Sequence, residues 1–392
     1  MNKKTVRDIE VAGRRVFVRV DFNVPLDQGR ITDDHRITAA LPTIAYLCDH
    51  DAAVILASHL GRPKGPEPSL RMDPIARRLQ ELLRRPVRKL DDCVGPEVEA
   101  AVGAMRRGDV VLLENLRFHP EEEANDPSFA RGLARLAEVY VNDAFGTAHR
   151  AHASTVGVAK LLPAVAGLLM ERELTFLGKV LEAPTRPLVA ILGGKKVEDK
   201  IGVIRNLLRL AQTMLIGGGM CYTFLRAAGG KIGASLCEAD KLDLAGELMA
   251  DAQRRGVRLL LPVDVVAAQR PSADAAVRTV DARAIPDGWM GLDIGPRTEA
   301  AFAAPIAAAG TVLWNGPMGV FELAPFAHGT QAVARAVAES PAESIVGGGD
   351  TASAVEQLGY ADKMTHISTG GGATLEFMEG KVLPGVAVLM DR

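Results

Sequence analysis

The sequence predicts an α/β protein built from two Rossmann-like three-layer lobes with parallel sheets, joined by a long helix and a hinge. Short β-branched runs alternate with longer segments of helical periodicity along the 392 residues, which is typical of parallel sheets with helices on both faces. The chain is also longer than one hydrophobic core usually supports. Near its middle, a helical pattern from Leu168 to Leu181 breaks at Pro184 and Pro187.

These observations divide the chain. We expect an N-terminal domain over residues 1–165, an interdomain helix and hinge over 166–186, and a second domain from residue 187. The expected strands are, in order, RRVFVRVDF, AAVILASH, DVVLLEN, AEVYVNDAF, RPLVAILGG, TMLIGGG, VRLLLPVDV, TVLWNG, SIVGGG and HISTGGG. The expected helices between them include 37–48, 73–83, 201–210 and 242–254.

Composition excludes several classes of protein. The formal net charge is −2, so a bulk nucleic-acid or anionic-membrane binder is not expected. The N-terminus has no apolar signal region, and no stretch reads as a membrane span. The four cysteines are scattered without a CxxC pair, which predicts reduced thiols in a cytoplasmic protein rather than a disulfide or zinc set.

Polar residues gather where the first-half strands end. Asp21 and Asn23 follow the first strand, and His59 and Arg62 follow the second. Arg117 and His119 follow the third, the stretch NDAFGTAHRAHAS follows the fourth, and Arg36 opens the first helix. Ligands of open α/β sheets bind at the carboxyl ends of strands. Arginine forks there match phosphate and carboxylate oxygens, so we predict a pocket for a small, multiply charged anion.

Glycines follow several second-half strands. Triple glycines begin at Gly217, Gly347 and Gly370, each before a helical segment. A helix N-terminus attracts anions, and glycine lets phosphate oxygens come close. Asp350 adds an oxygen ligand suited to Mg²⁺ beside Thr351. For Gly217–Gly219, a packing role stays open beside a ligand role.

Lysines and a carboxylate follow two further strands. The stretch LGGKKVEDKI carries Lys195, Lys196 and Lys200, and a helix from about residue 197 predicts that the last two face the same way. Asn315, Pro317 and Glu322 follow another strand, where a carboxylate suits ribose hydroxyls. The acidic run Glu121–Glu123 reads as a solvated loop rather than a metal site.

Two other nucleotide-binding classes fit poorly. The P-loop pattern GxxxxGK[ST] is absent from the chain. The run from Gly347 to Ala352 fits the loose pattern GxGxxA, but it lies too near the C-terminus and the next strand lacks the ribose-binding acid. A nicotinamide-dependent dehydrogenase is therefore not expected.

Eight ordered motifs resemble the phosphoglycerate kinase family, over nearly the whole chain. They are RVDFNVPL, SHLGRP, ENLRFHPEEE, NDAFGTAHRAHAS, ILGGKKVEDKI, WNGPMGVFE, GGGDT and STGGGATLE. The resemblance implies a bacterial-type, hinge-bending, monomeric kinase that moves a phosphoryl group between ATP and the carboxylate of 3-phosphoglycerate. It implies 3-phosphoglycerate or 1,3-bisphosphoglycerate on the N-terminal domain, and ATP or ADP with Mg²⁺ on a C-terminal domain over 187–382. It also implies that 383–392 packs back on the N-terminal domain.

The family's site residues carry over position by position. Substrate contacts fall on Asp21, Asn23, Arg36, His59, Arg62, Arg117 and Arg150. Nucleotide contacts fall on Lys200, Asn315, Pro317, Glu322, Gly347, Gly348, Gly349, Asp350 and Thr351, with Asp350 as the metal partner. Lys196, Arg36, Gly371 and Gly372 match the groups around the transferred phosphoryl.

The chemistry agrees with this assignment. No general base is evident, and a carboxylate nucleophile with a pKa of about 4 needs none at neutral pH. Two positions depart from the family pattern, Lys195 and Cys221, and neither removes a matched catalytic residue. An inactive regulatory relative that binds nucleotide or sugar phosphate, and a non-enzymatic surface role, remain as alternatives.

Overall fold

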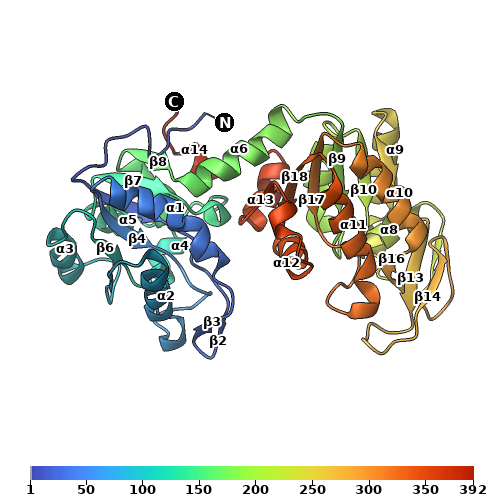
Figure 1. Ribbon diagram of the computed structural model, residues 1–392, viewed down its shortest axis with the longest axis horizontal. Coiled ribbons are helices and arrows are strands. Elements are labelled where there is room, and N and C mark those ends of the chain that lie inside the picture. Colours follow the sequence, from blue (N-terminus) through green and yellow to red (C-terminus); the bar gives the residue numbers. More distant parts are fainter. Residues whose placement is uncertain (1) are drawn as a thin grey trace. The chain divides into compact units, whose positions relative to one another are not determined.

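The computed structural model describes residues 2–392, which form two compact units. The first contains the chain up to Thr175 together with Val382–Arg392, and the second contains Phe176–Lys381. The boundary falls inside helix α6 (Leu168–Glu182). Both chain ends lie beside β8 and α14 of the first unit (Figure 1), where the Lys4 N–H donates to the Met390 carbonyl.

The first unit contains a six-stranded parallel sheet in the order β5-β6-β4-β1-β7-β8. Its strands are β1 (Arg15–Arg19), β4 (Ala53–Ala57), β5 (Val87–Lys89), β6 (Val110–Leu112), β7 (Val139–Asn142) and β8 (Ala164–Ala166), with a hairpin of β2 (Leu26–Asp27) and β3 (Arg30–Ile31). Its helices, besides the start of α6, are α1 (His35–Asp49), α2 (Asp73–Leu83), α3 (Pro96–Gly103), α4 (Pro120–Glu123), α5 (Pro127–Ala134) and α14 (Pro384–Ala387).

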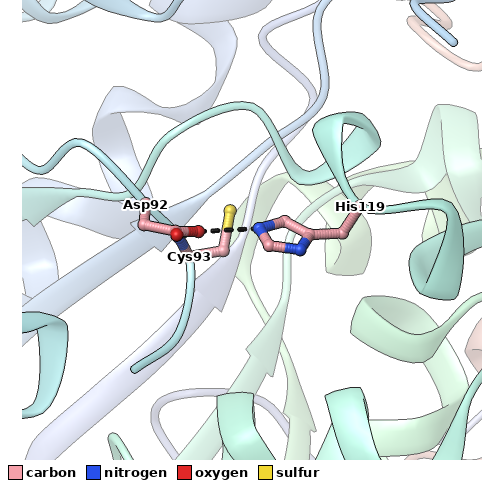
Figure 2. Close-up of side chains that lie close together, drawn as sticks. All are labelled: Asp92, Cys93 and His119. Atoms are coloured by element: carbon pink, nitrogen blue, oxygen red, sulfur yellow. Dashed lines mark hydrogen bonds and ion pairs between the residues drawn. The ribbon is translucent and has the colours of Figure 1, made fainter. Parts of the chain in front are cut away.

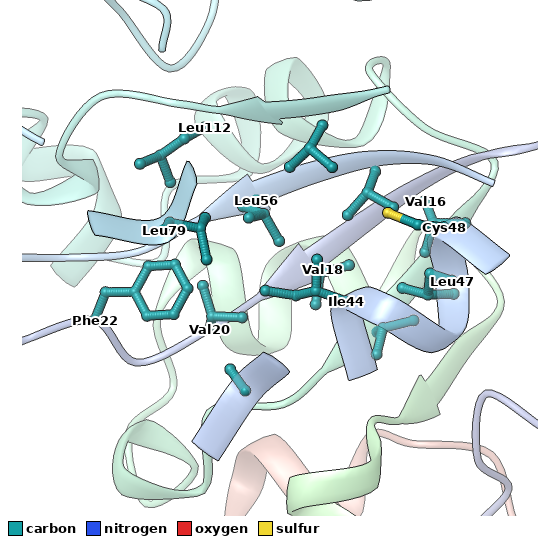
Figure 3. Close-up of a cluster of buried hydrophobic side chains, with 14 of the residues drawn as sticks. Val16, Val18, Val20, Phe22, Ile44, Leu47, Cys48, Leu56, Leu79 and Leu112 are labelled. Carbon is teal, nitrogen blue, oxygen red and sulfur yellow. The ribbon is translucent and has the colours of Figure 1, made fainter. Parts of the chain in front are cut away.

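Helices on both faces explain why the strands read as continuous apolar runs. Val16 and Val18 of β1 point to one face and pack with Ile44 and Leu47 of α1 (Figure 3). Phe17, between the two valines, points to the other face. Each such side chain, fully buried, contributes about 1.5–3 kcal/mol. This core holds the strand ends at one edge.

The second unit repeats the plan with the strand order β12-β10-β9-β17-β18-β19, again parallel. Its sheet consists of β9 (Leu188–Leu192), β10 (Thr213–Ile216), β12 (Arg258–Leu260), β17 (Thr311–Asn315), β18 (Glu343–Gly347) and β19 (His366–Ile367). Its helices are α7 (Ile201–Leu207), α8 (Cys221–Ala227), α9 (Leu242–Arg254), α10 (Pro296–Ala307), α11 (His328–Glu339), α12 (Gly349–Gln357) and α13 (Gly372–Met378). The predicted α/β class with parallel sheets is confirmed.

One predicted strand is wrong. The run VRLLLPVDV contains β12 and the first two residues of β13 (Asp264–Ala268), because Pro262 between the two strands has no N–H to continue a ladder. β13 lies between β14 (Arg278–Asp281) and β16 (Met290–Ile294) in an antiparallel sheet that the sequence did not predict. β11 (Lys231–Ile232) pairs with β15 (Ala284–Ile285). Within residues 2–392, no helix combines the length and apolar character needed to cross a bilayer.

A buried carboxylate caps the N-terminus of α6. Asp143 Oδ1 accepts hydrogen bonds from the backbone N–H of Leu169 at 2.9 Å and of Met170 at 3.2 Å. A Cβ on Gly167 would collide with this carboxylate, so only glycine fits there. Burial raises the pKa of Asp143 to about 6, although the hydrogen bonds oppose the shift.

Asp143→Asn is expected to gain stability relative to the parent as pH rises. An unfolded aspartate has a pKa of about 3.9, so the folded parent binds the proton of Asp143 more tightly than the unfolded chain does. The free energy of unfolding of the parent therefore falls by about 1.4 kcal/mol per pH unit between about pH 4 and pH 6. Asparagine keeps the acceptor without the charge. Urea unfolding at pH 4.5 and 7 measures the difference, with Asp126→Asn at the half-buried cap of α5 as control. Equal pH dependence in parent and Asp143→Asn would contradict this assignment.

Candidate active site

The polar residues of the first unit lie at one edge of its sheet. β6, β4, β1 and β7 are neighbours and run parallel, so the segments that follow them leave the sheet side by side. These are the segments that carry the residues predicted to bind an anion. The strand order, which no local pattern states, therefore brings them together.

Arg36 is tied to the segment after β1. Its Nη1 donates to Asp21 Oδ2 and to the Asn23 carbonyl, both at 3.1 Å. Asn23 Oδ1 in turn accepts the Gly61 N–H at 2.8 Å. The side chain of Arg36 stays 35% exposed, so the guanidinium is oriented and keeps donors for a ligand.

Three further arginines differ in how they are held. Arg117 is buried, and its Nη1 donates to the Gly61 carbonyl at 2.7 Å. Arg150 is half-buried and donates from Nε to His149 Nε2 at 3.2 Å. Arg62 is exposed, and its side chain makes no hydrogen bond or ion pair within residues 2–392.

The electrostatics of His59 show how positive this edge is. The ring is 4% exposed. Burial holds the pKa of His59 well below its usual value, and the charges of Arg19, Arg117, Arg150 and Arg36 lower it further. His59 is therefore a neutral hydrogen-bonding group at pH 7, surrounded by four cations.

A buried polar network supports the pocket, and the sequence analysis missed it. Arg19, 1% exposed in β1, donates to Ser154 Oγ at 2.8 Å and lies 3.2 Å from His59 Nδ1. Ser154 donates to Glu122 Oε1 at 2.5 Å. Glu122 is 1% exposed, so a solvated Glu121–Glu123 loop is wrong for this residue. The available signal was the arginine inside VFVRV, where a buried charge needs a partner.

The glycine segments of the second unit also share one edge. β10, β9, β17, β18 and β19 are consecutive neighbours. Asn315 and Gly347 are the last residues of β17 and β18, and Gly217, Gly193 and Gly370 come shortly after β10, β9 and β19.

These glycines fall into two groups. A Cβ at Gly217 would meet Met318 Sδ at 2.5 Å, and one at Gly218 would meet the Gly194 nitrogen at 2.5 Å. Packing therefore explains this triple glycine. A Cβ at Gly349 or Gly371 would meet nothing within 4 Å. Space in front of those two backbones is open.

Lys200 is the buried cation of this edge. Its Nζ donates to the Asn315 carbonyl at 2.7 Å and to Asn315 Oδ1 at 2.6 Å. Burial lowers the pKa of Lys200 to about 8, opposed by the charges of Asp199 and Asp350. Two of the three ammonium hydrogens bind Asn315, and the third is left for another acceptor.

The prediction that Lys196 and Lys200 face the same way is wrong. Lys196 precedes the helical residues and is exposed, whereas Lys200 is buried. The residues Glu198–Lys200 form a 3₁₀ turn that starts after Lys196, and the α-helix begins only at Ile201, so the α-helical spacing that the prediction assumed does not hold.

The remaining residues predicted to contact the nucleotide are either held by the packed loops or exposed to solvent. Thr351 Oγ1 accepts the Gly316 N–H at 2.7 Å, which fixes the loop holding Pro317. A Cβ at Gly348 would lie 3.1 Å from Asn315 Nδ2. Glu322 and Asp350 are exposed, without a hydrogen bond or ion pair to other residues in 2–392.

Each unit thus offers donors for phosphate oxygens at one sheet edge, arginines in the first and open backbone N–H groups with lysines in the second. Such edges suit phosphorylated ligands, which open α/β sheets bind at the carboxyl ends of their strands. The family model for phosphoglycerate kinase matches residues 6–381. The chain belongs to the phosphoglycerate kinase family.

Individual relatives agree over the full length. The phosphoglycerate kinase of Moorella thermoacetica is 62% identical over 393 residues, and that of Pelotomaculum thermopropionicum is 61% identical, with 100% of each chain covered. The solved phosphoglycerate kinase from Coxiella burnetii gives a TM-score of 0.90 at 42% identity, covering 98% of both chains. The chain is therefore a glycolytic phosphotransferase, as the motifs predicted, and nothing supports the inactive relative.

Proposed function

We propose that 3-phosphoglycerate, or 1,3-bisphosphoglycerate in reverse, binds at the sheet edge of the first unit. The residues that we assign to it are Asp21, Asn23, Arg36, His59, Arg62, Arg117 and Arg150. The observation that carries the assignment is the set of four cations acting on the buried, neutral His59. Arg36 and Arg117 are each paired with one carboxylate, Asp21 and Glu123. Phosphate and carboxylate oxygens of the ligand would add charge-assisted hydrogen bonds to the remaining donors of these arginines.

ATP or ADP binds, in this proposal, at the sheet edge of the second unit. The residues that we assign are Lys200, Asn315, Pro317, Glu322, Gly347, Gly348, Gly349, Asp350 and Thr351. Support comes from the open space before Gly349 at the start of α12 and from the unused hydrogen of Lys200. Glu322, exposed beyond β17, suits the ribose hydroxyls.

Mg²⁺ accompanies the nucleotide, with Asp350 as its protein ligand. Mg²⁺ usually keeps several waters and takes one or two carboxylates besides the substrate phosphates. An exposed aspartate in the first turn of α12 fits that requirement. The ion would neutralise charge on the phosphates during transfer.

The transfer needs positioning and charge neutralisation rather than proton abstraction, because the attacking carboxylate is already ionised. Arg36, exposed Lys196 and the backbone N–H groups of Gly371 and Gly372 would stabilise the moving phosphoryl group. The two ligands must meet without water between them. We infer hinge bending around the α6 region, in a monomeric cytoplasmic enzyme.

Separate binding of the two ligands tests the assignment. Lys200→Met is expected to weaken ADP binding 10- to 100-fold and to leave 3-phosphoglycerate binding unchanged. Arg62→Ala should weaken 3-phosphoglycerate binding and leave ADP binding unchanged. Calorimetric titration of each full-length variant with each ligand gives both constants.

The ADP affinity of the parent should also fall above pH 8, where Lys200 loses its charge. The ADP affinity of Lys200→Arg should not fall there. Lys363→Met, at an exposed site, is the control. Unchanged ADP affinity in Lys200→Met would refute the assignment.

A further inference from the structure

Three side chains with metal-ligating atoms meet in the first unit, outside the residues assigned to substrate. Asp92 and Cys93 follow β5, and His119 follows β6, 26 residues later along the chain. One carboxylate oxygen, the Cys93 sulfur and one imidazole nitrogen all lie within 4.8 Å of one another. Figure 2 shows the sulfur beside the 2.7 Å contact between Asp92 Oδ1 and His119 Nε2.

Each of the three groups is held in place by the surrounding fold. Cys93 is fully buried, and its Sγ donates to the Glu114 carbonyl at 3.0 Å. The His119 ring stacks on Phe129 with 4.8 Å between centroids. Asp92 Oδ1 also accepts the Cys93 backbone N–H at 2.6 Å. The cluster therefore needs little ordering to act as a unit.

Two of the three groups, Asp92 and His119, are reachable from solvent, whereas Cys93 is buried beside them. Asp92, Glu114 and His119 line a cavity of about 240 Å³, together with Arg71. The neighbouring acids Asp91 and Glu114 are paired with Lys89 and Arg71. Within residues 2–392, the carboxylate of Asp92 has an ion pair with His119 and with no other residue, so it can turn to a cation without breaking those pairs.

We propose that Asp92, Cys93 and His119 form a binding site for a divalent metal ion of the Zn²⁺ class. Thiolate, imidazole and carboxylate are the three ligand types that zinc accepts, and Mg²⁺ has no preference for two of them. Three atoms within 4.8 Å of one another place a central ion at most about 2.8 Å from each, close to the zinc distances of about 2.0–2.3 Å. Water in the cavity would supply a fourth ligand.

Binding exchanges bonds in a defined way. The Cys93 thiol proton leaves to solvent, and its hydrogen bond to Glu114 is lost. The proton on His119 Nε2 leaves that nitrogen, the neutral ring keeping one on Nδ1, and the contact between Asp92 and His119 is replaced by two metal bonds. The ion then links the segment after β5 to the segment that carries Arg117. The site differs from the zinc sets that the sequence analysis excluded, because its ligands come from two strand ends rather than from a cysteine pair.

Cobalt(II) titration of the metal-free full-length protein tests the site. Cobalt bound to a thiolate gives a near-ultraviolet charge-transfer band, which we expect at one equivalent and which Zn²⁺ should abolish by displacement. Cys93→Ala should remove the band. Cys48→Ala, another buried cysteine of the same unit, should keep it.

Variants at the cavity guard against misfolding of Cys93→Ala. His119→Gln and Asp92→Asn, at partly exposed positions, should each weaken cobalt binding at least tenfold while circular dichroism stays unchanged. The proposal fails if the parent shows no thiolate band, if the band survives Cys93→Ala, or if both His119→Gln and Asp92→Asn bind like the parent.

Discussion

Lys196→Ala is expected to lower kcat for acyl-phosphate formation by about 10²–10³-fold. The exposed ammonium of Lys196 follows β9 at the edge where the open glycine backbones lie, and nothing in residues 2–392 occupies it with a hydrogen bond or ion pair. A group that meets the phosphoryl only during transfer lowers kcat and kcat/KM together when it is removed. The measurement mixes Mg-ATP with 3-phosphoglycerate and traps the product with hydroxylamine.

Lys195→Ala is the matched control for that experiment. Lys195 is the preceding residue and is also exposed, but the family resemblance assigns it no role. We expect less than a threefold change. If both alanine variants lose activity alike, the general positive charge of this loop matters rather than a donor at residue 196. If Lys196→Ala stays active, the catalytic assignment is wrong.

Arg19→Met is expected to destabilise the first unit by about 3–5 kcal/mol, because removing one member of a buried charged network leaves the other uncompensated. Glu122 would lose the nearby charge that lowers its pKa against the larger effect of burial. For a unit of this size the unfolding midpoint should fall by on the order of 10 °C. Calorimetric scans of the full-length protein measure it.

The double variant Arg19→Met/Glu122→Gln separates charge from packing. It should recover much of the stability, because neither charge then remains buried. Additive losses in the double variant would show that Arg19 contributes through packing alone.

Arg19→Met also removes the neighbour of His59 Nδ1, so KM for 3-phosphoglycerate should rise even where the variant is folded.

The fold was predictable because its signals are local. Buried parallel strands read as apolar runs, and α2 and α9 match their predicted bounds. The edge strands β5 and β8 carry too little pattern to stand out, because β5 reads VRK, with one apolar residue, and β8 reads only AVA. The antiparallel sheet around β13 depends on Pro262 interrupting a run whose composition is otherwise uniform.

The candidate site was predictable wherever a side chain follows a strand directly, as with Asp21 and Asn315. Side chains that act through burial were not. The burial of Lys200 goes with its contact to Asn315, 115 residues away along the chain, which no pattern in its own segment shows. The partnership of Arg19 with Glu122 spans over 100 residues, and only the packed sheet brings the two together.

The crowding among glycines around β9 and β17 limits how this enzyme can be engineered. A Cβ at Gly193 would collide with the backbone at Gly316 and Pro317, and one at Gly316 with that of Gly193. No side chain can be introduced there without rebuilding two loops at once. Libraries that aim to change nucleotide preference should therefore leave these positions fixed and vary the exposed Glu322 instead.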